Sequence, residues 1–198
     1  MTYSLSEVEA LCKKATRGAG MSWGLAEDAA KSVRWLCSWG LPGVHVLARH
    51  LEDRKGDTGP ANPAATTWSA AGQLCPIICA TLLSDMGSQA LERRLMHVRW
   101  PLLLLPYGVG PLAICWGTTR IDVTDHVSIS GPLTSPVADK VTVTRKIDTG
   151  GQPCTRSLRA EIAEADLETL TRLAARTYAP ETETSKLTGA GAGLQDTD

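Results

Sequence analysis

The stretch Arg17-Gly-Ala-Gly-Met-Ser-Trp-Gly-Leu-Ala-Glu-Asp-Ala29 decides how the fold begins, because it separates two segments with helical hydrophobic spacing. Gly18 and Gly20 can adopt a positive φ without a Cβ penalty, so they allow one helix to end and the chain to reverse. Gly24 follows near the start of the next helix. The stretch therefore predicts a tight corner between two helices.

The same corner combines groups that bind anions. An arginine can donate two parallel hydrogen bonds to a carboxylate, and the start of a helix offers free backbone N–H groups. We therefore expect these residues, with one histidine of a later helix, to bind a small anionic metabolite. The predicted ligand-binding residues are Arg17, Gly18, Gly20, Trp23, Gly24, Glu27 and His45.

A second interpretation of the corner is purely structural. In that case Trp23 anchors the corner in the hydrophobic core, and Arg17 only caps or pairs within the fold. Glu27 and Asp28 favour this interpretation, because their charges suit the first turn of a helix and repel an anion. Both interpretations stay open at the level of sequence.

Around the corner, the pattern predicts a helical unit over residues 4–51. Ser4 and Glu7 have the spacing of a capping box, so we expect the first helix to begin there. The hydrophobic spacing predicts a second helix over about 24–39 and a third over 42–51.

The second half changes in character after a loop over 52–67 that is rich in glycine, proline and aspartate. We expect a short helix from Pro76 and a further helical turn or two over 89–96. Segments rich in Val, Ile, Leu and Thr predict an antiparallel β-meander, followed by an edge strand and a last helix packed on the sheet. These segments are 97–105, 112–119, 121–130 and 137–146, then 153–160 for the edge strand and 166–178 for the helix.

These elements form a single α+β domain over 1–180, with a helical part (4–51), the loop (52–67) and a mixed part (68–180). Hydrophobic residues make up 43% of the chain and charged residues 21%, as in ordinary globular proteins. Residues 181–198 contain few apolar side chains, so we expect a tail that is extended or disordered, or an arm docked in a groove.

Charge and hydropathy argue against several functions. The net charge of −1 lacks the basic excess that nucleic acids and anionic membranes attract. No apolar run reaches the roughly 18 residues that a membrane span needs, and the first residues lack the pattern of a secretory signal. We expect a cytoplasmic protein.

The cysteines and histidines do not form a recognisable metal or catalytic motif. Cys75 and Cys79 are the only close cysteine pair, and without a second pair the spacing favours buried thiols, so we expect no metal and no cofactor. His45 and His50 point to different sides of a helix at this spacing. His126 follows Asp125 on a predicted strand and is a candidate general base.

Both ends of the chain resemble one family. The segment Glu7-x-x-Ala-Leu-x-x-Lys-Ala-x-Arg-Gly-Ala-Gly-x-x-Trp-Gly-Leu-Ala-Glu27 resembles the opening of an uncharacterised, mainly alphaproteobacterial domain of unknown function. The Arg176-Thr-Tyr-x-Pro180 segment and the Gly-Ala-Gly-Ala-Gly-Leu run over 189–194 are similar to that family's ending. Lys186 and Thr197 depart from its pattern of arginine and asparagine. The resemblance implies a bacterial protein and assigns no activity.

Three functions remain open. The first is a binding protein or enzyme for a small, carboxylate-bearing metabolite, with its site at the corner. The second is an accessory subunit without catalytic activity, which binds a partner enzyme through the sheet and the tail. The third is a structural homo-oligomer that pairs through an edge of the sheet.

Overall fold

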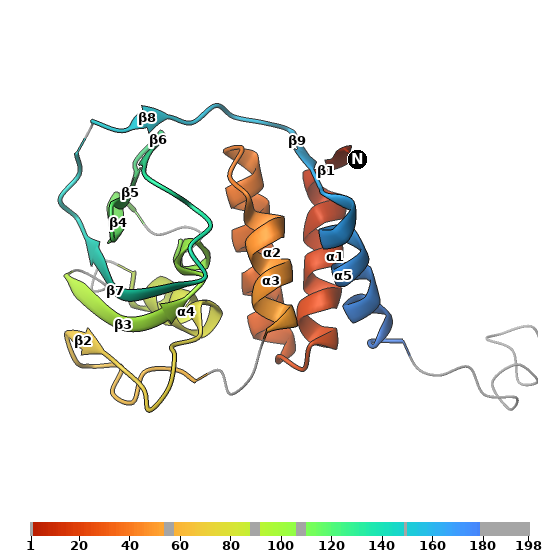
Figure 1. The fold of residues 1–198 in the computed structure, drawn as a ribbon, viewed down its shortest axis with the longest axis horizontal. Coiled ribbons are helices and arrows are strands. Elements are labelled where there is room, and N and C mark those ends of the chain that lie inside the picture. Colours follow the sequence, from red (N-terminus) through yellow and green to blue (C-terminus); the bar gives the residue numbers. More distant parts are fainter. Residues whose placement is uncertain (1, 54–57, 88–91, 106–109, 149, 179–198) are drawn as a thin grey trace, which may run out of the picture.

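The computed structural model describes residues 2–53, 58–87, 92–105, 110–148 and 150–178. In this part of the chain, a layer of helices lies beside a seven-stranded sheet (Figure 1). The fold class is α+β, as the sequence predicts. The predicted tail over 181–198 lies outside the described residues.

The helices are α1 (Leu5–Gly18), α2 (Trp23–Ser38), α3 (Gly43–Glu52), α4 (Pro76–Met86), the 3₁₀-helix η2 (Pro101–Leu104) and α5 (Glu164–Ala175). The strands are β1 (Thr2–Ser4), β2 (Thr67–Trp68), β3 (Arg93–Arg99), β4 (Leu112–Trp116), β5 (Thr119–Val123), β6 (Val127–Ser130), β7 (Val137–Thr144), β8 (Gln152–Pro153) and β9 (Arg159–Glu161).

The start of α1 confirms the predicted capping box. The Ser4 Oγ accepts a hydrogen bond from the Glu7 backbone N–H, and the Glu7 carboxylate accepts one from the Ser4 N–H at 2.7 Å. Two backbone donors that a helix start leaves free are thereby satisfied. Local side-chain chemistry alone sets this boundary.

The corner between α1 and α2 uses its two glycines in different ways. Gly20 has a φ of +93°, as expected of the residue that reverses the chain. The expected positive φ at Gly18 is wrong, because Gly18 is the last residue of α1. A Cβ at Gly18 would lie 1.8 Å from the Leu173 carbonyl oxygen, so this glycine allows α5 to approach α1 closely.

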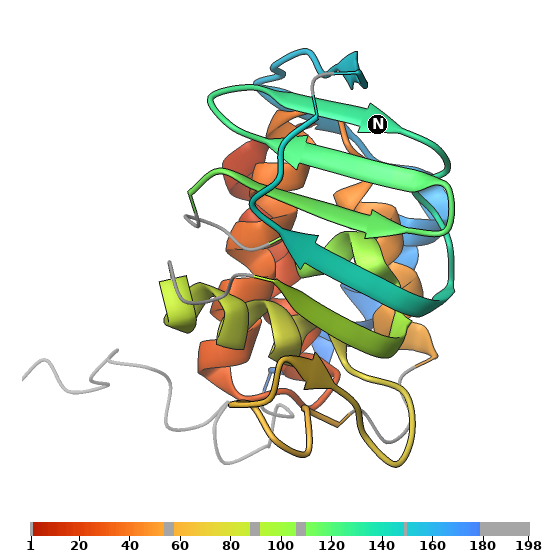
Figure 2. The same ribbon diagram turned by 90° about the vertical axis from the view of Figure 1, so that its left-hand side faces the viewer.

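The large sheet has the strand order β2-β3-β7-β4-β5-β6-β8. Figure 2 shows the sheet facing the viewer with the helices behind it. On β7, the third strand in this order, Val141 and Val143 are buried, whereas Thr142 and Thr144, which alternate with them, are partly exposed. This alternation is typical of a sheet with one face on the core and the other towards solvent.

The predicted meander is correct only for β4, β5 and β6, which pair in sequence order. β7 lies between β3 and β4, where Val141 pairs with Leu95 on one side and with Trp116 on the other. The long segment 131–136 lets the chain pass its neighbours before β7 begins. Strand order depends on this long-range pairing, which hydrophobic alternation does not encode.

Two predictions between α4 and β4 are wrong. The helical turn expected over 89–96 is contradicted from Arg93 onward by β3, whose Arg93–Arg99 backbone pairs with β7, while residues 89–91 lie outside the described part of the chain. The strand expected over 97–105 ends at Arg99, and η2 follows, because Trp100 adopts a left-handed conformation with φ +40° and Pro101 begins a 3₁₀ turn. The leucines of η2 are buried, so their apolar character could not distinguish helix from strand.

A strap from β8 to β9 connects the sheet with the helical layer at one end of the molecule (Figure 1). The Ser157 N–H donates to the Ser38 carbonyl at 2.9 Å, which fixes the strap on the end of α2. Of the edge strand expected over 153–160, only the beginning is correct: β8 pairs with β6 at the edge of the large sheet, whereas β9 pairs with β1 in a separate two-stranded sheet.

α5 packs along α1 and α3 and so lies in the helical layer, whereas the sequence placed it directly on the strands. Between the two layers, α4 and η2 contact each other and α2. One continuous hydrophobic core includes residues of all these elements, with Leu36, Leu104 and Ile114 fully buried. The described helices and strands therefore share a single core.

Candidate functional site

The predicted corner residues mostly contact one another. The Arg17 guanidinium donates a hydrogen bond to the Met21 carbonyl at 2.9 Å and lies 5.3 Å from the centre of the Trp23 ring. Trp23 is 55% exposed and is therefore no core anchor. Gly24 has open space around the position of a Cβ. The corner thus presents an exposed indole beside a partly buried guanidinium.

Glu27 is held by two lysines. Its carboxylate lies 2.9 Å from the Lys31 ammonium and 3.0 Å from that of Lys13. The hydrogen bond from Lys31, and then the one from Lys13, lower the pKa of Glu27 to about 2. This acid stabilises the seam between α1 and α2, and a ligand-binding role for the corner stays a prediction.

His45 lies far from the corner along the helical layer. It is near the start of α3, whereas Arg17 is at the end of α1, and these helix ends lie at opposite ends of the layer in Figure 1. The structure therefore brings Arg17, Trp23 and Glu27 to one region and places His45 in another. A single site built from the whole predicted set is not formed.

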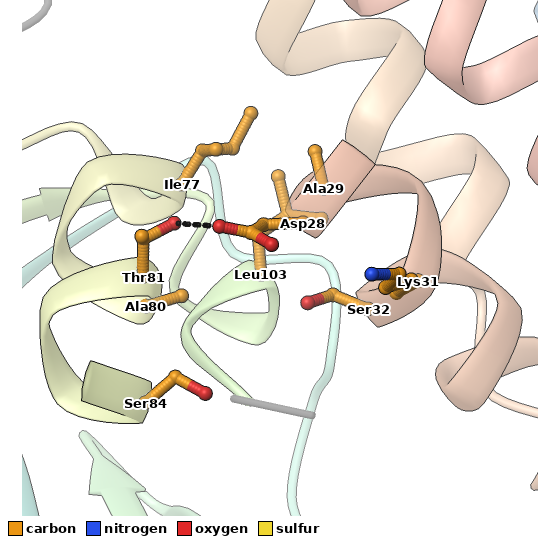
Figure 3. Close-up of a pocket in the computed structure, with 9 residues that line it drawn as sticks. All are labelled: Asp28, Ala29, Lys31, Ser32, Ile77, Ala80, Thr81, Ser84 and Leu103. Carbon is orange, nitrogen blue, oxygen red and sulfur yellow. Dashed lines mark hydrogen bonds between the residues drawn. The ribbon is translucent and has the colours of Figure 1, made fainter. Parts of the chain in front are cut away.

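A small cavity lies between α2 and α4 (Figure 3). The Thr81 hydroxyl donates a hydrogen bond to the Asp28 carboxylate at 3.2 Å across it, while Ser32 and Ser84 lie on its two sides. Its volume of about 110 Å³ is well below the roughly 300–1,000 Å³ of ligand pockets. It has room for a few water molecules, and we assign it to helix packing.

A larger cavity of about 620 Å³ lies at the end of the helical layer that the strap crosses. One wall comes from the end of α2 and the start of α3, and the other comes from β9 and the start of α5. Its lining is Thr2, Cys37, Gly40, Leu41, Pro42, Gly43, Val44, His45, Ser157, Arg159, Ala160, Glu161, Ile162, Ala163 and Asp166. Of the residues predicted to bind a ligand, His45 lines this cavity.

His45 and Asp166 form a close pair in the larger cavity. The Nδ1 atom of His45 lies 3.0 Å from the Asp166 Oδ2 atom. The Asp166 side chain is only 5% exposed, and its other oxygen lies 3.8 Å from the Arg49 guanidinium. The His45 side chain is 39% exposed. Its ring packs edge-on against the Trp100 ring, with 6.4 Å between the two ring centres. A buried carboxylate thus holds a histidine that solvent can reach.

Backbone geometry places this histidine. A Cβ at Gly43 would lie 2.8 Å from the Leu36 Cβ, so the glycine lets the start of α3 approach α2. Burial raises the pKa of the Cys37 thiol to about 11, although the backbone of Val44 and Gly43 acts in the opposite direction. Cys37 is therefore a protonated thiol that covers the start of α3, and His45 follows in the first turn.

Arg159 supplies positive charge on the opposite wall. Its guanidinium donates a hydrogen bond to the Thr2 carbonyl at 3.1 Å, and the Ser157 hydroxyl bonds to the Arg159 carbonyl. A guanidinium carries five N–H donors, so this bond leaves others for a ligand. α5 begins at Glu164, and its N-cap residue Ala163, which also lines the cavity, makes no side-chain cap. Arg159 and the start of α5 therefore lie on the same side of the cavity.

Sequence reasoning missed both Asp166 and Arg159. Asp166 is 121 residues from His45 and reads as an ordinary acid in the first turn of the last helix. Arg159 falls in a segment that the sequence predicts as an edge strand. One local feature pointed to this site. The Ala163 side chain cannot cap the last helix, so the free backbone N–H groups of its first turn need another hydrogen-bond partner.

The remaining histidines and cysteines are separate from this cavity. His50 is buried, with its Nε2 atom 3.7 Å from the Cys75 sulfur, a contact that sequence spacing could not show. Burial raises the pKa of Cys79 to about 12. His126 lies in the turn between β5 and β6, where its backbone N–H donates a hydrogen bond to the Thr124 hydroxyl. Among the residues that the structure describes, no three His, Cys, Asp or Glu side chains gather as a metal site would need.

None of the helices in the described ranges combines the length and the apolar character that crossing a bilayer requires. Residues 3–75 match the model of a family described as a protein of unknown function (DUF3726). The match covers α1, α2 and α3 and ends before α4 begins. No curated protein and no solved structure matches the chain.

Proposed function

We propose that this protein binds a small, carboxylate-bearing metabolite in the cavity between the start of α3 and the start of α5. The observation that carries the proposal is the convergence of His45, Asp166 and Arg159 on one cavity of about 620 Å³. Its volume lies within the range of small-molecule sites. The corner around Arg17 remains a second predicted contact region.

The charges of the lining support an anionic group on the Arg159 side. One oxygen of Asp166 contacts His45 and the other faces Arg49, so both carboxylate oxygens already have partners within the protein. The Arg159 guanidinium donates to a backbone carbonyl, and the Glu7 carboxylate lies within range of its charge. A ligand carboxylate at Arg159 would gain charge-assisted hydrogen bonds and could reach the N–H groups at the start of α5.

Thermal-shift measurements with a panel of small carboxylates test the proposal. A ligand at about one hundred times its Kd stabilises the native state by about 2.7 kcal/mol, which corresponds to a rise in Tm of roughly 5–10 °C. Arg159→Gln should abolish most of this rise while the protein stays folded. If no carboxylate raises the Tm of the unmodified protein, the proposal is wrong.

Arg156→Gln is the matched control, because Arg156 lies on the same strap and lines a different groove. Its guanidinium lies 4.0 Å from the centre of the Trp39 ring. The variant can lower the Tm by losing this contact, but the ligand-induced rise should equal that of the unmodified protein. If both variants lose the ligand-induced rise in Tm equally, the positive charge of the strap as a whole, and not Arg159 in particular, is responsible for the rise.

The exposed corner favours a second candidate function, that of an accessory subunit. Trp23 is 55% exposed beside Arg17, and Tyr178 is 64% exposed beside Lys14. Exposed tryptophan, tyrosine and arginine are the residues that anchor protein interfaces most often. The tail that this hypothesis also uses lies outside the described residues. A Trp23→Ala variant that loses a co-purifying partner but keeps its Tm would support it.

A cytoplasmic location is part of the proposal. The six cysteines are free thiols, and Cys12, Cys75 and Cys79 are fully buried. Burial of free thiols suits a reducing compartment, where cysteine acts as a small hydrophobic residue. Cell fractionation with an antibody against the native protein tests the location.

A further inference from the structure

We propose that His45 is a general base in this cavity and that Asp166 is its positioning residue. The inference rests on the proposed function, because it concerns the same cavity and gives its ligand a reaction. It assigns a proton-transfer site of the kind that activates a hydroxyl group or a water molecule. The geometry of the pair carries the inference.

The contact to Asp166 decides which nitrogen of His45 can accept a proton. Nδ1 faces the Asp166 Oδ2 atom at 3.0 Å, and a carboxylate accepts hydrogen bonds, so Nδ1 carries the proton of the neutral ring. Nε2 then holds the lone pair. Because the His45 side chain is 39% exposed and lines the cavity, this lone pair is accessible to a bound molecule.

The surroundings keep the pair in place. Asp166 is held from its other side by Arg49 at 3.8 Å, and the ring of His45 packs edge-on against Trp100. The charged groups around the pair are Arg49, one turn after His45 on α3, and Arg159 and Glu161 of β9, which line the same cavity. A fixed carboxylate behind a histidine is the arrangement that orients a base and stabilises the imidazolium it forms.

His45 would activate a hydroxyl group or a water molecule next to the ligand. An O–H bond of a bound hydroxyl or water breaks, its proton forms a new N–H bond at Nε2, and the electron pair stays on the oxygen. That oxygen attacks a carbonyl carbon of the ligand, and the leaving group departs with the electrons of the broken bond. The imidazolium, stabilised by Asp166, then returns its proton to the leaving group or to solvent. With water as the nucleophile, the result is hydrolysis of an ester-like bond.

Nuclear magnetic resonance of the ring nitrogens tests the tautomer without any ligand. Long-range ¹H–¹⁵N spectra at about pH 8.5, where an ordinary histidine is neutral, should show His45 protonated on Nδ1. Asp166→Asn should change the His45 pattern and leave that of His126 unchanged. A His45 protonated mainly on Nε2 in the unmodified protein would contradict the inference.

Hydrolysis of 4-nitrophenyl acetate tests the base itself. The unmodified protein should hydrolyse this probe faster than His45→Gln by roughly 10²-fold, the usual contribution of a general base. His97→Gln, which removes an exposed histidine on β3, should match the unmodified protein. Equal rates for His45→Gln and the unmodified protein would overturn the inference.

A purely structural pair gives a different set of results. If Asp166 only ties α5 to α3, then Asp166→Asn lowers the Tm and leaves the tautomer and the hydrolysis rate of the folded protein unchanged. The same experiments distinguish a failure of the proposed ligand binding from a failure of the general-base inference. In that case no carboxylate raises the Tm, while the Nδ1–H tautomer and the His45-dependent hydrolysis are still observed.

Discussion

At the scale of single residues, Gly18 and Gly24 look equivalent in the sequence but have different surroundings. A Cβ at Gly18 would lie 1.8 Å from the Leu173 carbonyl oxygen, whereas one at Gly24 would meet no atom within 4 Å. We predict that Gly18→Ala lowers the free energy of unfolding by about 1–3 kcal/mol or more, because α5 must move away from α1. Urea unfolding of the variant measures the loss.

Gly24→Ala is the matched control for this prediction. The residue is in the first turn of α2, where alanine has the higher helix propensity, so its stability should stay within about 0.5 kcal/mol of the unmodified protein or rise slightly. An equal loss of stability in both variants would mean that backbone conformation, and not the contact with α5, makes glycine necessary at Gly18.

At the scale of elements, the seam between α1 and α2 should depend on pH through Glu27. Its pKa is lowered from 4.5 to about 2 by Lys31 and Lys13, so the folded protein binds a proton at this site less readily than the unfolded chain. The carboxylate therefore stabilises the fold above about pH 4.5, and this contribution is lost as the pH falls towards about 2. Because the pair is exposed, the effect is small and salt reduces it.

Glu27→Gln tests the pH dependence. The variant should be less stable than the unmodified protein at neutral pH, and the difference should shrink as the pH falls from about 4.5 towards 2, as followed by urea midpoints. Glu168→Gln is the control, because Glu168 is exposed on α5 and forms no ion pair with a described residue. A difference for Glu27→Gln that does not change with pH would exclude an electrostatic origin.

At the scale of the whole molecule, the helical layer needs a partner from the far end of the chain. Leu170 and Leu173 of α5 are buried in the same core as Val8 and Cys12 of α1. The stretch that matches the family model, residues 3–75, includes α1 but not α5. We predict that a fragment of residues 1–75 unfolds without a cooperative transition, because one face of α1 is then uncovered.

The full chain should unfold in one transition, with circular dichroism and tryptophan fluorescence giving the same midpoint. Fluorescence reports on both layers, since Trp39 lies on the helical side and Trp116 in the sheet. A cooperative fragment that melts near the Tm of the full chain would show instead that the helical layer folds independently.

The fold was predictable where the determining contacts are local. The capping box of Ser4 and Glu7 gave the start of α1, and Pro76 gave the start of α4, because a cap or a proline acts within one turn. Residues 93–96 of β3 were missed because their conformation depends on pairing with residues of β7 that lie 44 to 50 positions later. The candidate site was predictable only in part, since His45 was named without Asp166 and Arg159.

The sequence by itself therefore determined the α+β class, the helices at the start of the chain and the positive φ of Gly20, since hydrophobic spacing, capping and glycine freedom act between neighbours. Only the tertiary structure decided that β7 lies between β3 and β4, that Gly18 admits α5, and that Asp166 stands behind His45. Each of these depends on which distant segments share the core. Burial of apolar surface fixes that choice for the whole chain at once, and no short stretch of sequence records it.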